Sequence, residues 1–263
     1  MQRSPSSRMC VCGRYASTKD LNQLGIEFGA QLRARIREPA PNLDVRPTTP
    51  VPFLQGRLGE DGVVRRELSV GRWGMIPTFA KAFESKFATF NARSEDVGDK
   101  PTFRNSVPRW RAAVPAAGYA EWKKSGPKRT DPKQRYEVAP EDGGTITFAG
   151  LYAPWRNTAV QDESHPDAWL LSCTILTMPA PPLDSGHPAL AGLGGLHDRL
   201  PVPLAAGTID AWLDPRDKDG LGLLDLVRGE AYDVAADWAL RPVELVNDED
   251  GRQRLETVAN PIV

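Results

Sequence analysis

The sequence has few residues that could build a disulfide framework or a metal site. Its 263 residues include only three cysteines and three histidines: Cys10, Cys12, Cys173, His165, His187 and His197. Three cysteines cannot form a full set of disulfides, so we expect a protein of the reducing cytoplasm. No second pair of these residues has the spacing of zinc ligands, and we therefore expect no metal.

Long apolar segments and an overall excess of charge are also missing. Residues 1–8 are polar and rich in serine and proline, which excludes a signal peptide or a membrane-spanning segment there. A net charge of −1 gives no general attraction to nucleic acid. The charges are unevenly placed, however. Residues 65–135 hold 16 Lys/Arg against 7 Asp/Glu, and the remainder holds 17 against 27. This basic sector predicts a local field that attracts phosphates.

Short apolar segments bounded by Gly and Pro predict an α+β protein with many strands. Strands are expected at 51–54, 63–70, 145–152 and 169–177. A helix capped by Ser17 or Thr18 is expected to bury Leu21, Leu24, Phe28 and Leu32. Further short helices are expected after a cap at Asn91, at 208–213 and at 221–227. The absence of repeats and long linkers favours one domain over residues 12–263.

Cys12, in the segment Cys12-Gly13-Arg14-Tyr15, carries the first candidate chemistry. As a first residue it would have an α-amine with a pKa of about 8 beside a thiol with a pKa of about 8.5. Such a pair condenses with an aldehyde to a Schiff base, which the thiol closes to a five-membered thiazolidine. Residues 1–11 would then have one of two origins. Either the start codon has been placed too early and Val11 is the true start, or these residues are a leader that is cut off. A start at Met9 would expose Cys10 instead. The simpler alternative is a buried, inert Cys12.

Two other segments combine polar and aromatic side chains. Glu121 lies between Tyr119 and Trp122 at the end of an apolar strand, where desolvation raises a carboxyl pKa toward the range useful for proton transfer. The alternative is a solvent-facing Glu121 that pairs with a neighbouring lysine. The aromatic residues Phe79, Phe83 and Phe87 alternate with lysines, which is typical either of a surface that stacks bases or of ordinary core.

The order of the motifs is more informative than any one of them. They follow the chain as Cys12-Gly13-Arg14-Tyr15, Arg72-Trp73-Gly74-Met75-Ile76-Pro77, Asn91-Ala92-Arg93-Ser94-Glu95, Gly118-Tyr119-Ala120-Glu121-Trp122, Phe148-Ala149-Gly150-Leu151 and His197-Asp198-Arg199-Leu200-Pro201-Val202. This series resembles the SOS response-associated peptidase (SRAP) family from Cys12 to the C-terminus. The resemblance implies a barrel-like, bifurcated antiparallel sheet with peripheral helices and no cofactor. It also implies a cytoplasmic protein of the DNA damage response that is found on the nucleoid when bound to damaged DNA.

The resemblance implies a reaction and a partner. The protein would crosslink itself to abasic sites in single-stranded DNA through Cys12, without a membrane or an obligate protein partner, and could remove its own leader. Asn91 would hold the amine and the sugar, Glu121 would act as general acid and base, and His197 would assist ring opening. Basic side chains would contact phosphates, and weaker candidates would line the strand. Those seven DNA-contacting residues are Arg14, Arg93 and Arg199, and then Thr48, Trp73, Phe79 and Thr177.

Some residues depart from the family pattern, and two other functions stay open. Met9-Cys10-Val11 precedes Cys12 where the family has the initiator methionine, and Ala120 replaces a more common aromatic residue. A cysteine peptidase or amidase could use Cys12 and His197 on an external substrate without a free amine. A non-catalytic single-stranded DNA-binding protein would need only the basic sector.

Overall fold

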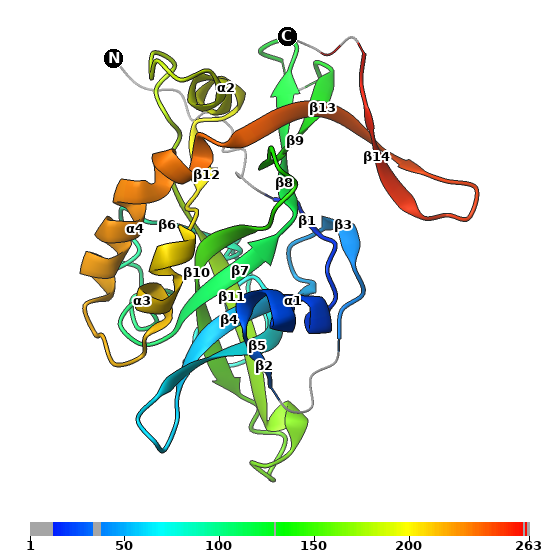
Figure 1. The fold of residues 1–263 in the computed structure, drawn as a ribbon. Coiled ribbons are helices and arrows are strands. Elements are labelled where there is room, and N and C mark those ends of the chain that lie inside the picture. The colour runs from blue at the N-terminus through cyan, green and yellow to red at the C-terminus, as the bar shows by residue number, and fades with distance from the viewer. Residues whose placement is uncertain (1–12, 34–37, 129, 260, 262–263) are drawn as a thin grey trace.

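The computed structural model describes residues 13–33, 38–128, 130–259 and 261. Most of the chain is in two β-sheets with short helices around them (Figure 1). The strands are β1 (Tyr15–Ser17), β2 (Gln31–Leu32), β3 (Asn42–Val45), β4 (Pro50–Leu58), β5 (Val64–Trp73), β6 (Asn91–Arg93), β7 (Arg111–Ala116), β8 (Gly118–Lys124), β9 (Lys133–Pro140), β10 (Ile146–Arg156), β11 (Trp169–Pro179), β12 (Arg199–Pro201), β13 (Trp238–Asn247) and β14 (Gln253–Thr257). The helices are α1 (Leu21–Phe28), α2 (Pro188–Leu196), α3 (Ile209–Leu213) and α4 (Gly220–Ala235), with 3₁₀ turns η1 (Pro166–Ala168) and η2 (Ala206–Thr208).

One sheet closes into a barrel. Its order is β12-β11-β10-β7-β4-β5-β2, and an additional parallel pairing of β11 with β5 closes the five strands from β11 to β5 into a ring. Bulky apolar side chains such as Phe53, Leu54 and Ile175 pack on the two faces of this sheet and are almost completely buried. The apolar segments at 145–152 and 169–177 are therefore strands β10 and β11, as predicted. Both faces of β11 are covered, which explains its nearly continuous apolar sequence.

The second sheet has the order β14-β13-β9-β8-β1-β3 and branches from the barrel where β7 continues into β8. The expected α+β fold with a bifurcated sheet and peripheral helices is confirmed. Helix α4 and α3 lie on one side of the barrel, and α2 packs against β8 and β13 (Figure 1). No helix among the residues that the structure covers is long and apolar enough to cross a membrane.

Two local predictions of secondary structure were wrong. Asp20, rather than Ser17 or Thr18, caps α1, and its side chain accepts a hydrogen bond from the Gln23 backbone. The helix ends at Gly29, whose positive φ of 58° suits glycine, so Leu32 lies outside the helix and is exposed. Asn91 begins strand β6 and caps no helix. A cap pattern alone cannot predict this, because the strand forms by pairing with β11, more than 80 residues away.

Buried Glu137 on β9 predicts a pH-dependent stability. Its carboxyl lies against Gly118, where a Cβ atom would meet Oε1 at 2.6 Å. One carboxyl oxygen accepts no hydrogen bond from any residue in the described ranges. Burial raises the pKa of Glu137 from 4.5 to about 7, although Arg135 and Arg241 oppose the shift. The folded protein therefore binds this proton more tightly than the unfolded chain, and stability is lost as pH rises from 4.5 through 7.

We expect Glu137→Gln to remove this loss. Below pH 4.5 the variant should match the wild type, and at pH 8 it should be more stable by up to about 3 kcal/mol. Urea unfolding of both proteins at pH 5 and at pH 8 measures the difference. An advantage of the variant that is equal at the two pH values would show that ionisation of Glu137 is not its source.

Candidate functional site

Cys12 and Cys10 lie outside the described residues, which begin at Gly13. The next residues pair with β8. The backbone N–H of Ala120 donates to the carbonyl oxygen of Arg14 at 3.0 Å, and Tyr15 is opposite Tyr119. Glu121 is the following residue on β8 and is only 5% exposed. This register brings the start of the described chain alongside the buried carboxylate, so the interpretation of Glu121 as a solvent-facing residue was wrong.

A second set of contacts connects the same end of β1 with Asn91. The ring of Tyr15 packs edge-on against Trp73, with 5.1 Å between centroids. Trp73 packs against Phe90 and donates from Nε1 to the Phe90 carbonyl oxygen at 2.9 Å. Half-buried Asn91 follows directly and begins β6. The early chain, Trp73 and Asn91 are thus held in one corner between the two sheets.

Trp73 was a candidate for lining the DNA strand, and its position argues against direct contact. The residue is 0% exposed, and its ring is held between Tyr15 and Phe90. The sequence could not distinguish this buried role from an exposed one, because tryptophan serves both. In this conformation Trp73 supports the corner from within the core.

Strand β11 brings two predicted phosphate contacts to its two edges. On one edge Arg93 of β6 is opposite Thr177, and on the other Arg199 of β12 is opposite Pro179. Arg93 is exposed and forms no ion pair within the described ranges. Thr177 is buried, accepts a hydrogen bond from Arg199 and donates one to Ala92 at 3.4 Å. Direct contact of the Thr177 side chain with a DNA strand is therefore blocked, and the residue positions Arg199.

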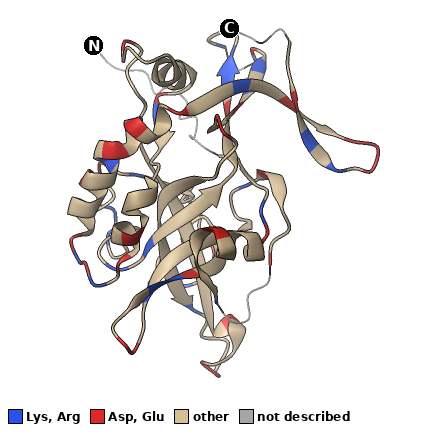
Figure 2. Cartoon of the chain, in the orientation of Figure 1, with Lys and Arg blue, Asp and Glu red and all other residues tan. Residues whose placement is uncertain are grey.

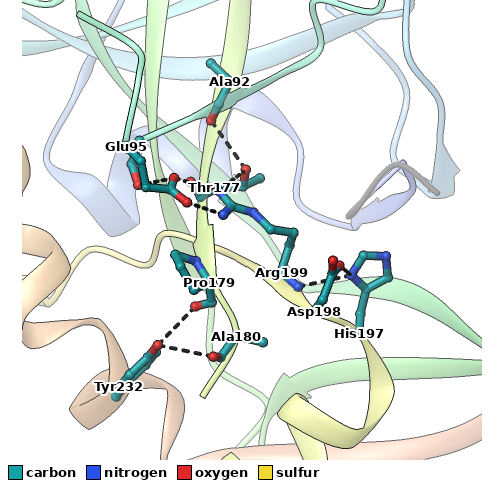
Figure 3. Close-up of polar contacts among 10 residues, drawn as sticks. Ala92, Glu95, Thr177, Pro179, Ala180, His197, Asp198, Arg199 and Tyr232 are labelled. Atoms are coloured by element: carbon teal, nitrogen blue, oxygen red, sulfur yellow. Dashed lines mark hydrogen bonds and ion pairs between the residues drawn. The ribbon is translucent and has the colours of Figure 1, made fainter. Parts of the chain in front are cut away.

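Arg199 extends across β11 to Glu95 (Figure 3). Its two terminal nitrogens contact the two carboxylate oxygens, and Nη2 also donates to the carbonyl oxygen of Thr177 at 2.7 Å. Partial burial would raise the pKa of Glu95, but the hydrogen bond and the charge of Arg199 outweigh it and lower that pKa to about 2. Glu95 is therefore ionised throughout the neutral range and occupies the guanidinium group with which Arg199 would hold a phosphate.

We expect Glu95→Gln to strengthen binding of single-stranded DNA about fivefold at 0.1 M KCl. The substitution frees one cation for a phosphate, and each such contact adds about 0.7 to the salt slope of binding. Fluorescence anisotropy with a labelled oligonucleotide at several KCl concentrations measures both quantities. Glu163→Gln is the matched control, since Glu163 is an exposed partner of Arg156 in the loop before η1. Weaker binding by Glu95→Gln would show instead that Glu95 orients Arg199 for the DNA.

His197 is held at the C-terminal end of α2. Its Nδ1 is 3.1 Å from the backbone nitrogen of Arg199 and 2.7 Å from a carboxylate oxygen of Asp198. One nitrogen cannot accept the first hydrogen bond and donate the second at the same time. Burial lowers the pKa of His197, although Asp198 acts in the opposite direction. Burial therefore favours the neutral ring near pH 7, in which Nδ1 either accepts from the Arg199 backbone or donates to Asp198.

The other candidate DNA contacts are on the surface. Thr48 is exposed, has a positive φ of 76° and donates from its backbone to the Trp73 carbonyl oxygen at 2.6 Å. A β-branched residue in this conformation is strained, and such strain concentrates at functional sites. Phe79 is 62% exposed and Phe87 is also exposed, whereas Phe83 packs against Trp155.

Cys173 is fully buried, which raises the pKa of its thiol to about 12 and makes it inert.

No group of three His, Cys, Asp or Glu residues that could hold a metal occurs in the described part of the chain. The charged groups are distributed as Figure 2 shows, with basic residues at the paired ends of β8 and β9.

Comparison with known proteins decides the family. The model of the SOS response associated peptidase (SRAP) family matches residues 11–246, a range that includes every candidate site residue. The chain belongs to the SRAP family. The abasic site processing protein YoqW of Bacillus subtilis is 30% identical over 237 residues, covering 90% of this chain and 94% of that protein. The yeast abasic site processing protein YMR114C is 31% identical over 147 residues, which is 54% of this chain and 34% of that protein.

Solved structures agree with this SRAP fold. A phage-related protein from Bordetella bronchiseptica is 26% identical and superposes with a TM-score of 0.61, covering 90% of this chain and 96% of that one. A protein from Bacteroides thetaiotaomicron with 18% identity has a TM-score of 0.64 and covers 89% and 92%. This second likeness concerns the fold alone. The barrel and branching sheet of this SRAP chain are therefore shared with experimentally solved proteins.

Proposed function

We propose that this SRAP chain processes abasic sites in single-stranded DNA by forming a covalent thiazolidine crosslink through Cys12. The α-amine of Cys12 adds to the C1′ aldehyde of the ring-opened deoxyribose, and water leaves as the imine forms. The sulfur then adds to the imine carbon, while the thiol proton passes to nitrogen. The step needs no oxidant, reductant or metal. It requires Cys12 to be the first residue, so residues 1–11 must be absent or removed, and the active domain would span residues 12–263.

The register of β1 against β8 is the observation that carries this proposal. Gly13 and Arg14 run alongside β8 where it holds buried Glu121, and Tyr15 contacts the Trp73 corner from which Asn91 begins β6. The described chain therefore begins beside the strand that carries Glu121 and the corner that carries Asn91. The names of the relatives, which are abasic site processing proteins over most of this chain's length, support the same substrate.

Each polar residue then has a role that follows from its chemistry. Asn91 would hold the amine and the sugar by hydrogen bonds. Glu121, shielded from water, would take up and return the protons that move during ring opening and imine formation. Neutral His197 would donate from Nε2 to the sugar or its 3′ phosphate. α2, which ends at His197, packs against β8, the strand that carries Glu121.

The DNA strand would be held mainly by exposed or releasable cations. Arg14, Arg93 and Arg199 are assigned to backbone phosphates, with Arg199 exchanging Glu95 for a phosphate oxygen. Exposed Phe79 would stack on a base, and Thr48 would line the strand beside it. Trp73 and Thr177 would act indirectly by holding Asn91 and Arg199 in place.

The imine accounts for one further activity, and the residues before Cys12 for another. A Schiff base at C1′ acidifies the proton on C2′, so strand cleavage by β-elimination would be a side reaction of the intermediate. Removal of residues 1–11 by the chain itself would be the peptidase activity in the family's description.

A uracil-excised single-stranded oligonucleotide tests the proposal. We expect a conjugate that survives heat and detergent, and none with the intact oligonucleotide. Mass spectrometry of the purified protein establishes in parallel whether residues 1–11 are present. If a protein that begins at Cys12 binds the oligonucleotide but forms no conjugate, the chain is a non-catalytic DNA-binding protein. Cleavage of added peptides by a protein with a blocked amine would indicate an external peptidase.

A further inference from the structure

Asp44 on β3 is the centre of a cluster of three arginines, of which the proposed function assigns only Arg14 to DNA. The carboxylate is 7% exposed. It accepts from Arg14 Nη1 at 3.0 Å, from Arg46 Nη2 at 2.9 Å and from Arg135 Nη1 at 3.3 Å. Arg14 directly precedes β1, Arg46 directly follows β3 and Arg135 lies on β9, so the three residues are distant in the sequence. A single carboxylate thus holds three guanidinium groups that would otherwise repel one another.

The cluster lines an open pocket of about 410 Å³ that has an excess of positive charge. Its wall also includes Lys133 and Trp122, and its acidic members are Asp44 and exposed Glu244. Four cations against two carboxylates leave a net charge of +2 around this pocket. The two carboxylates therefore neutralise only part of the positive charge around the pocket, and a bound anion would neutralise the rest.

The contacts of Arg135 show that the fold fixes this cluster, which is not a random encounter of mobile surface side chains. Its side chain is only 9% exposed, and its guanidinium lies over the ring of Trp122 at 5.8 Å. A second hydrogen bond, to the Leu43 carbonyl oxygen at 3.2 Å, fixes the group further. Its buried Nε has no hydrogen-bond partner in the described ranges. A guanidinium held in this way loses little conformational entropy when it binds an oxyanion.

The pocket lies on the other face of the sheet from Glu121. Neighbouring residues of a strand point to opposite faces, so Glu121 faces away from the side of β8 where Trp122 lines the pocket. Arg14 follows Cys12 by two residues and is common to both places.

We propose that the pocket formed by Arg14, Arg46 and Arg135 around Asp44 is a second phosphate subsite, which holds the backbone of single-stranded DNA beyond the abasic nucleotide. The proposed subsite rests on the proposed function only for the identity of its ligand, which is single-stranded DNA. Arg46 is the exchangeable member, because its side chain is 64% exposed and is free to turn toward a phosphate. Asp44 and Arg135 are positioning residues that keep the guanidinium groups together.

Arg46→Gln tests the proposal without disturbing the core. Binding of an intact oligonucleotide, without an abasic site, is measured by fluorescence anisotropy as a function of KCl concentration. We expect affinity about fivefold weaker at 0.1 M KCl and a salt slope smaller by about 0.7, which is the loss of one phosphate contact on a single strand. Since no crosslink is involved, the result is independent of whether Cys12 reacts.

Arg57→Gln is the matched control. Arg57 is an equally exposed arginine with a carboxylate partner, Glu67, but it lies in the β4–β5 hairpin at the opposite end of the molecule (Figure 1). Equal affinities and slopes for Arg46→Gln and Arg57→Gln would overturn the proposal. The proposal would also be overturned if Arg46→Gln lost the thermal stabilisation given by inorganic phosphate but kept its affinity for the oligonucleotide.

Discussion

Replacing Cys12 with alanine is expected to abolish the heat-stable conjugate with an abasic oligonucleotide, a loss of at least about 100-fold given the effective molarity of the neighbouring thiol. In a protein produced without residues 1–11, alanine as the first residue keeps the α-amine, so the variant should still form a Schiff base, which is reversible in water. Borohydride reduction would trap this imine as a stable amine. The expected pattern is therefore no conjugate without borohydride and a clear conjugate with it.

Three further proteins make this result specific. Cys173→Ala should react normally, because that thiol is buried and its raised pKa of about 12 keeps it protonated. Cys10→Ala should also react normally unless the chain begins at Cys10. A protein that retains residues 1–11 should form neither conjugate, since its Cys12 nitrogen is an amide. A stable conjugate from Cys12→Ala without borohydride would exclude the thiazolidine.

The sequence was most informative where a property depends on neighbouring residues. Apolar segments predicted the long strands β10 and β11, and the buried face of α1 was predicted at Leu21, Leu24 and Phe28. The order of the motifs also indicated the family that the comparisons show. Such features are predictable because each is set by a few adjacent side chains and by periodicity.

Features set by distant partners could not be predicted in the same way. The partner of Glu95 is Arg199, more than 100 residues later, and no local pattern indicates this pair. Asn91 begins a strand because β11 is available to pair with it. The cluster around Asp44 collects arginines from three distant segments, and in the sequence Asp44 is one acidic residue before an apolar segment. Each case depends on which strands the closed barrel and the branching sheet bring together.

The second large effect concerns Glu121. We expect Glu121→Gln to form the conjugate about 10²- to 10⁴-fold more slowly, the usual contribution of a general acid and base. Glutamine has the same shape and still makes hydrogen bonds, but it cannot exchange protons with the sugar or the imine. Single-turnover measurements, with conjugate separated on denaturing gels over time, give the rate. Affinity for an intact oligonucleotide should stay unchanged, because glutamine keeps the shape of the side chain and the proton transfer requires an abasic sugar.

Glu137→Gln is the matched control for this rate. Glu137 is also a buried carboxyl of the same sheet, but it is opposite Ala120 and therefore on the other face from Glu121. If loss of a buried charge slowed the reaction only by altering the sheet, both variants would be slow. A slow Glu121→Gln beside a normal Glu137→Gln locates the proton transfer at Glu121. A normal rate in Glu121→Gln would instead remove Glu121 from the chemistry and leave proton transfer to His197 or water.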